Sequence, residues 1–237
     1  MAAASVAAGG GGRGELAGQH SDADALWAAL DMDSAPDGRF SDPHFIARLM
    51  HGVSAMIANA AGDPGATADI AQRVAATPRF ISAAATLVED GGNLCFAAPQ
   101  ALALVLSASG ATHAAVVGFD GGRVVAGLVG SIAGSKPDPV LQPLVAMVLQ
   151  ALCEGPQRKT AADILAEQVA TRRVVCGFFE SATCRCAGTS VVSAMLVTEA
   201  GRAWCTKHFE SLELHTVGSA LHTKLIARTG KAGGTTT

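Results

Sequence analysis

The apolar residues of this chain follow a helical pattern that occurs three times, and each copy begins at an arginine. Counted from Arg79, Arg123 and Arg173, the offsets +1, +2, +5, +6 and +9 carry apolar or small residues in every copy. These offsets trace one stripe of a helix with about 3.6 residues per turn, which is the side that packs against a core. The sequence therefore predicts three equivalent amphipathic helices. Their stripe residues are Phe80, Ile81, Ala84, Ala85 and Val88, then Val124, Val125, Leu128, Val129 and Ile132, then Val174, Val175, Phe178, Phe179 and Ala182.

A second marker repeats with a similar period. Glycines follow the four longer apolar segments, and successive glycines are 48, 45 and 46 residues apart. Glycine is common just past the end of a helix because it tolerates the left-handed backbone conformation found there. We therefore expect four longer helices to end at these glycines, with a large apolar residue six positions earlier. The glycines are Gly62, Gly110, Gly155 and Gly201, and the apolar residues are Met56, Leu104, Leu149 and Met195.

Two markers with one period favour a repeat over a bundle without internal symmetry. A period of about 40–47 residues with two or three helices is typical of armadillo and HEAT units. Residues 42–215 resemble an armadillo-like helical repeat protein, in which each unit has a short helix, an arginine-led helix and a long helix. The resemblance implies an all-α fold, a short right-handed α-solenoid with a concave face that binds an extended peptide or another protein. The alternative is an irregular α-helical bundle.

The sequence departs from one branch of that family. The asparagine ladder with which importin-type members bind peptides is not recognisable, and aromatic residues make up only 4% of the chain. Peptide recognition of the importin kind is therefore not expected.

The pattern also predicts the organisation of the chain. Residues 1–20 are rich in Ala and Gly and are predicted to be disordered, and residues 227–237 are predicted to form a flexible tail. The helical repeat domain is placed at 21–226, with repeat ends near 62, 110, 155 and 201. It begins with a short amphipathic helix, Ser21–Leu30. A clear helix start follows at Asp42-Pro43, and a last helix is expected from Arg202 through Leu212.

Composition narrows the classes of protein. With 237 residues, 49% of them hydrophobic, the chain can bury a sizeable core. The net charge of −3, without a block of like charges, argues against bulk electrostatic binding to nucleic acid. No run of about 18 strongly apolar residues predicts a membrane span, and no signal peptide is recognisable. A cytoplasmic or nuclear protein is expected, with its six cysteines as free thiols rather than disulfides.

The three leading arginines are the candidate partner-binding residues. At equivalent positions of a solenoid, Arg79, Arg123 and Arg173 would line up along one edge, and such a ladder could bind an acidic partner. The alternative is that each arginine lays its stem over the core and keeps its charged head in water.

A cysteine-rich segment is the candidate for metal binding. Cys184-x-Cys186 is the nearest approach to a metal motif, with Cys205 and His208 as further ligands three residues apart. Zinc sites usually pair cysteines with two to four residues between them, so C-x-C is too closely spaced. Ordinary buried or loop thiols are the alternative. The chain has no phosphate loop, no GxSxG and no HExxH, so no catalytic residue and no cofactor is predicted.

These patterns together favour a non-catalytic protein-binding or scaffold module that acts through the concave face of a helical solenoid. The expected partner is another protein or peptide, an acidic one if the arginines form a ladder; neither nucleic acid nor membrane is expected. The alternative is a metal-binding protein or Cys/His enzyme built on an α-bundle with segment 176–222. A further alternative is that an effector domain lies outside this sequence.

Overall fold

The computed structural model describes residues 27–28, 40, 42–90, 92–134, 138–217 and 220–227, and of residues 210–227 the backbone alone. The chain divides into two units, Met1–Asp37 and Gly38–Thr237, and all elements named below belong to the second. The prediction of disorder in 1–20 lies outside the described residues, and so does the predicted flexible tail 227–237 except for Ala227, which is the last residue of a strand. So does most of the predicted helix Ser21–Leu30.

The helices of the second unit follow one another in a fixed order that recurs along the chain. We call the three recurring kinds series A, B and C, and series C contains the arginine-led helices. Series A consists of α2 (Pro43–Asn59), α5 (Ala97–Ala108), α8 (Leu141–Glu154) and α11 (Arg185–Met195); series B of α3 (Pro64–Ala75), α6 (Ala111–Gly118), α9 (Arg158–Glu167) and α12 (Glu199–His208); series C of α4 (Pro78–Asp90), α7 (Arg123–Ser131) and α10 (Thr171–Glu180).

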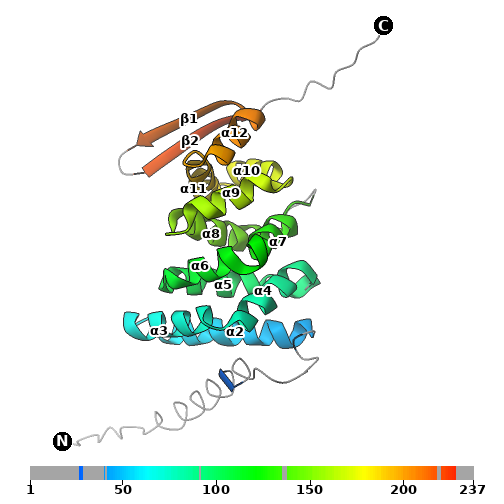
Figure 1. The fold of residues 1–237 in the computed structure, drawn as a ribbon, viewed down its shortest axis with the longest axis vertical. Helices are drawn as coiled ribbons and strands as arrows, with labels where there is room; N and C mark the ends of the chain where they lie inside the picture. Colours follow the sequence, from blue (N-terminus) through cyan, green and yellow to red (C-terminus); the bar gives the residue numbers. More distant parts are fainter. Residues whose placement is uncertain are drawn as a thin grey trace, which may run out of the picture. The chain divides into compact units, whose positions relative to one another are not determined.

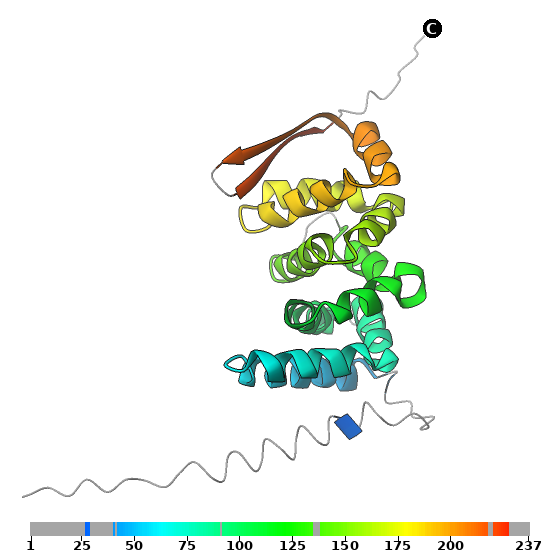
Figure 2. The same ribbon diagram turned by 60° about the vertical axis from the view of Figure 1, so that its left-hand side comes forward.

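Helices of series A pack against one another in sequence order, and some successive pairs of series B and C do the same. In series A, α5 packs against α2 and α8, and α8 packs against α11. The same holds for α4 with α7 in series C, and for α3 with α6 and α9 with α12 in series B. Figures 1 and 2 both show the resulting layers, from α2 in blue to α12 in orange.

The helix starts follow from local chemistry. The carboxylate of Asp42 accepts a hydrogen bond from the backbone N–H of His44 at 3.0 Å, which caps α2 as the sequence predicts. Asp63 does the same for α3, where it accepts from Gly65 N at 2.9 Å. Each aspartate precedes a proline, whose fixed φ suits the first helical position.

The predicted stripes agree with burial in two of the three series C helices. All five stripe residues of α4 and all five of the α7 segment are buried. In α10, Val174, Val175 and Phe178 are buried, but Phe179 is half-buried and Ala182 is exposed. The prediction is wrong at Ala182 because α10 ends at Glu180, so the last offset no longer lies on a helix.

The glycine markers have different roles. α2, α5 and α8 end within three residues of Gly62, Gly110 and Gly155, as predicted. Gly201 does not end α11, which stops at Met195; it lies in the first turn of α12. A side chain at Gly201 would collide with the backbone of Met195, so glycine is needed there for a close approach.

Gly155 also leaves room for a side chain of another helix, α6. A Cβ at Gly155 would collide with the imidazole ring of His113, a buried residue of α6. The Nε2 atom of that ring lies 3.2 Å from the carbonyl oxygen of Ala151 in α8. His113 therefore joins α6 to the end of α8, and glycine at position 155 makes that approach possible.

The end of the chain is not helical. The predicted last helix from Arg202 through Leu212 is wrong, because α12 ends at His208 and the backbone becomes extended at Phe209. Strands β1 (Phe209–Val217) and β2 (Ala220–Ala227) form an antiparallel hairpin (Figure 1). Apolar and polar residues alternate from Ser211 to Leu214, a period of two that suits a strand. Apart from this hairpin, the regular structure in the described residues is helical.

One stretch of the described chain is apolar and long enough to suggest a membrane span. Ala111–Ser131 has 21 residues and a mean hydropathy of 1.2. It is not one continuous helix, because Asp120, Gly121 and Gly122 have φ values of 44°, 63° and 93° and separate α6 from α7. The same turn brings Gly122 so close to Ile164 that a Cβ would stand 2.6 Å from its side chain.

Candidate functional site

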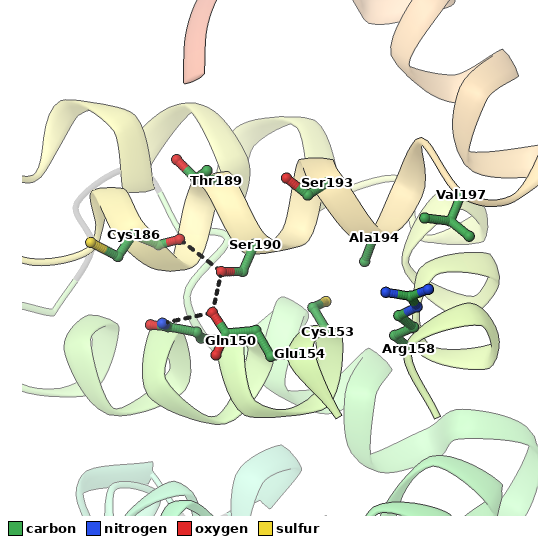
Figure 3. A pocket seen from close by; sticks show the side chains of 10 residues that line it. All are labelled: Gln150, Cys153, Glu154, Arg158, Cys186, Thr189, Ser190, Ser193, Ala194 and Val197. Atoms are coloured by element: carbon green, nitrogen blue, oxygen red, sulfur yellow. Dashed lines mark hydrogen bonds between the residues drawn. The ribbon is translucent and has the colours of Figure 1, made fainter. Parts of the chain in front are cut away.

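A groove lies between α8 and α11, the last two helices of series A. It encloses a cavity of about 470 Å³ and runs along the solvent-facing sides of both helices (Figure 3). We call it the α8/α11 groove. Its lining residues are Gln150, Cys153 and Glu154 of α8, Arg158 of α9, Cys186, Thr189, Ser190, Ser193 and Ala194 of α11, and Val197 beyond the end of α11.

A hydrogen-bonded group of side chains joins the two walls of the groove. The carboxylate of Glu154 accepts from Gln150 Nε2 at 3.0 Å and from Ser190 Oγ at 2.6 Å (Figure 3). The first bond links one turn of α8, and the second crosses from α8 to α11. A charged acceptor makes these bonds stronger than neutral ones. Glu154 is therefore held in place as an exposed negative charge at the rim.

A second serine in the groove lacks a partner. Ser193 Oγ is buried and makes no hydrogen bond within the described part of the chain. Ser193 lies one turn after Ser190 on the same side of α11 (Figure 3). An unpaired buried hydroxyl costs about 1–3 kcal/mol. A backbone amide or carbonyl that enters the groove would recover that cost.

The rest of the groove combines an apolar floor with a mixed rim. Cys153 and Ala194 are buried at the floor, and burial together with the charge of Glu154 raises the pKa of the Cys153 thiol to about 12. That thiol stays neutral and behaves as an apolar group. The rim carries the exposed side chains of Arg158, Cys186 and Val197. This mixture suits a polypeptide better than a small apolar ligand.

The three leading arginines have three different environments. Arg123 forms a two-pronged ion pair with Glu89 of α4, with Nε 3.0 Å from Oε1 and Nη2 2.6 Å from Oε2. The guanidinium of Arg79 lies over the ring of Phe40, 5.3 Å from its centre. Arg173 is exposed and forms no ion pair within the residues described. Of these three arginines, only Arg173 has a guanidinium with no partner among the described residues.

The structure does not assemble the four predicted metal ligands into one site. Cys184 and Cys205 are buried, and Cys186 is exposed in the α8/α11 groove. The ring of His208 lies against that of Trp204 in a tilted arrangement, with 4.8 Å between centroids. In the described ranges, no three Cys, His, Asp or Glu side chains gather as a metal-binding group. Positions two apart at a helix start point to different sides, which separates Cys184 from Cys186.

The thiols carry little sign of nucleophilic chemistry. All six cysteines are free, as expected. Burial raises the pKa of the Cys205 thiol to about 11, and burial followed by the charges of Lys207 and Arg172 lowers the pKa of His208. A catalytic cysteine needs a lowered pKa, usually from a nearby protonated histidine. The Cys205/His208 pair has the opposite arrangement.

Sequence reasoning missed the groove. Its key contact, between Glu154 and Ser190, joins residues 36 positions apart. A weak signal was present, because Gln150 and Glu154 are the polar residues in the second half of an otherwise mostly apolar α8, and Ser190 and Ser193 interrupt an apolar stretch of α11. That signal identifies solvent-facing positions but not which helix faces which.

Comparison with known proteins adds no relative. No protein-family model, no curated protein and no solved structure matches this chain. The function is therefore argued from the contacts, charges and cavities described above.

Proposed function

We propose that this chain is a non-catalytic protein-binding or scaffold module, built as a short right-handed solenoid of armadillo-like repeats. The recurrence of helix order supports the repeat. Three series B helices begin at Pro64, Ala111 and Arg158, which are 47 residues apart in each case. Packing in sequence order along series A, and between some successive helices of series B and C, supports a solenoid, because each unit of a solenoid contacts its neighbours.

The binding surface in this proposal is the solvent-facing side of series A. Exposed residues on α2 recur at helical spacing, at His44, Arg48, His51 and Ala55. The later helices add further exposed positions to the same series. They are Ser107 of α5, Met147 and Glu154 of α8, and Cys186 of α11, with Val197 just beyond it.

The unpaired hydroxyl of Ser193 carries the proposal. It lies in the α8/α11 groove, beside a fixed carboxylate acceptor and above an apolar floor. An extended peptide offers a backbone N–H and a C=O at regular intervals, and these groups match Ser193 and Glu154 in kind. We therefore take an extended segment of another protein as the occupant of the groove.

The test compares two exposed valines. Val197 lines the groove, whereas Val169 is fully exposed between α9 and α10. Val197→Arg should place a long cation in the groove and remove bound proteins from an affinity capture quantified by mass spectrometry. Val169→Arg is the matched control and should retain them, with both variants showing the circular dichroism spectrum of the parent chain. Equal capture by the two variants would show that the groove is not the binding site.

The alternative, a metal-binding protein or Cys/His enzyme using segment 176–222, has less support. The described cysteines and His208 do not converge on one point, and the raised pKa of Cys205 opposes its use as a nucleophile. No observation in the described chain favours that alternative over a binding module.

A further inference from the structure

Two series C helices begin with nearly the same five residues. Arg123–Gly127 of α7 reads RVVAG, and Arg173–Gly177 of α10 reads RVVCG. The two valines of each copy are buried. Because both helices bury the same side, the arginine and the glycine also occupy corresponding positions relative to the core.

In the first copy, this arrangement holds a carboxylate. Glu89, near the end of α4, extends across Gly127 and reaches Arg123 with both oxygens. A Cβ at Gly127 would lie only 3.4 Å from Glu89 Cγ and 3.3 Å from Val88 Cγ1, so glycine leaves the space that the glutamate stem fills. Together Arg123 and Gly127 form a cradle for a glutamate side chain.

In the second copy, the position that corresponds to Glu89 carries no glutamate. Glu89 stands ten residues after Arg79, and the residue ten positions after Arg123 is Ala133. Between the segment that follows α7 and helix α10 lies a cavity of about 230 Å³, which we call the Arg173 cleft. It is lined by Ile132 and Gly134, by Gln142 of α8, and by Arg173, Val174, Cys176, Gly177 and Glu180 of α10.

The remaining polar groups of the cleft fit a single carboxylate. A Cβ at Gly177 would lie 3.3 Å from Gln142 Nε2, so an amide donor occupies the neighbourhood that Glu89 occupies in the first copy. Arg173 also lies in the first turn of α10, where the helix dipole favours an anion. Glu180 lies in the same lining and pairs with no cation in the described chain. Its charge opposes any anion in the cleft, and it opposes a multiply charged anion such as phosphate more strongly than a single carboxylate.

We propose that the Arg173 cleft binds the carboxylate of a glutamate side chain presented by a partner protein, in the way that Arg123 binds Glu89. The partner protein rests on the proposed function, but recognition of the carboxylate can be tested without any partner. The cleft is lined by residues different from those of the α8/α11 groove, so the two sites can fail separately.

The first experiment is an NMR titration of the full chain with N-acetyl-glutamate methylamide, followed at the arginine Nε–Hε resonances. The Arg173 resonance should shift with this compound and not with the neutral N-acetyl-glutamine methylamide. The Arg123 resonance should not shift, because the guanidinium of Arg123 is already bound by Glu89. Arg123 is therefore the internal control. No shift at Arg173, or equal shifts with both compounds, would overturn the proposal. A larger shift with inorganic phosphate at equal concentration would replace the carboxylate by another anion and also overturn it.

In the second experiment, a glutamate is introduced at position 133, so that the chain itself provides the carboxylate. Ala133→Glu should pair with Arg173, abolish the titration shift at Arg173 and raise Tm by about 1–2 °C. Ala133→Gln is the control for size and should leave the titration intact. A second variant, Arg173→Gln, changes an exposed side chain and serves if substitution at 133 disturbs α7. In Arg173→Gln, the amide resonance of Gly177 should no longer shift on titration. A Gly177 shift that persists in Arg173→Gln would contradict the proposal.

The result also separates this site from the proposed function. Suppose that Arg173 shifts in the titration but that Val197→Arg captures the same proteins as the control. The carboxylate site would then stand, and the proposed binding surface at the α8/α11 groove would be wrong. Self-association of the chain that Arg173→Gln abolishes would make a second copy the occupant and would overturn the partner-protein proposal.

Discussion

The junction between α4 and α7 differs in packing and in one ion pair from the junction at the Arg173 cleft, where the segment after α7 meets α10. Both are built on buried apolar stripes, and both place an arginine and a glycine at corresponding positions. The first junction is closed by Glu89, whereas the second has Ala133 where a glutamate would close it. Two helices with similar sequences thus bury the same side and differ at the exposed edge, where the arginine that is paired in α7 is left for the proposed carboxylate in α10.

The largest expected effect tests the shared core. Leu128 and Phe178 stand five residues after their leading arginines, and both side chains are fully buried. Leu128→Ala should lower the free energy of unfolding by about 2–5 kcal/mol and Phe178→Ala by about 3–5 kcal/mol, because each leaves a cavity. Urea denaturation measures both. Val169→Ala, at a fully exposed position, should change stability by less than about 0.5 kcal/mol. A small effect at Phe178 alone would show that the second junction lacks the packing of the first.

The next largest effect concerns the partly exposed ion pair between Arg123 and Glu89. Arg123→Gln should lower Tm because it breaks the pair with Glu89, whereas Arg173→Gln should leave Tm unchanged because Arg173 has no internal partner in the described chain. The pair is partly exposed, so the loss should be smaller than for Leu128→Ala and should shrink at 1 M NaCl. Thermal melts at low and high salt provide the measurement. Equal losses for the two arginines would remove the difference between the junctions.

A smaller effect concerns the thiol in the open junction. Burial raises the pKa of the Cys176 thiol, and Glu180 raises it further, while Arg172 lowers it. Maleimide at pH 8 should therefore label Cys176 more slowly than the exposed Cys186, and Glu180→Gln should speed the labelling. Mass spectrometry after timed quenching identifies the labelled sites. Cys153 and Cys205, with pKa values raised to about 12 and 11, should stay unlabelled in the folded chain. Rapid labelling of Cys153 would mean that the groove floor is open to solvent.

The smallest expected effect is a dependence of stability on pH that arises at His208. It should depend on Arg172 and not on the neighbouring Arg173. Burial, Lys207 and Arg172 lower the pKa of His208 below its ordinary value near 6.5, so the folded chain binds a proton there less readily than the unfolded chain. The resulting stability is present above pH 6.5 and is lost as the pH falls through the folded-state pKa. Unfolding midpoints between pH 5 and 8 should show this slope, reduced in Arg172→Gln and unchanged in Arg173→Gln. The same slope in a His208→Gln variant would assign it to another group.

The sequence predicted those parts of the fold that depend on local periodicity. The stripes of α4 and α7 were predicted because an amphipathic helix shows its buried side directly in the spacing of apolar residues. The period failed at Ala182, where the helix had already ended, and at Gly201, where a close backbone contact required glycine instead of a helix end. The hairpin after His208 was missed because a helical period was extended into a segment whose apolar residues alternate.

The candidate sites were harder to predict, because both depend on which helices are neighbours. Arg173 was identified from its repeat position, but the three arginines were treated as equivalent. The absence of a carboxylate at Ala133 became meaningful only once Glu89 was placed beside Arg123. The pairing of Glu154 with Ser190 likewise requires that α8 packs against α11. Local pattern does not contain this information.

The contact between His113 and Gly155 has a consequence for how this chain can change over evolutionary time. No side chain fits at position 155 while the imidazole ring fills that space, whereas the ring can be lost first and leave only a void. The order of substitution is therefore constrained: a change at 113 first removes the larger of two clashes and leaves only the one with the carbonyl oxygen of Ala151 at 2.9 Å, whereas the reverse order meets both. Such epistasis would link the two positions in any lineage that keeps the contact between α6 and α8.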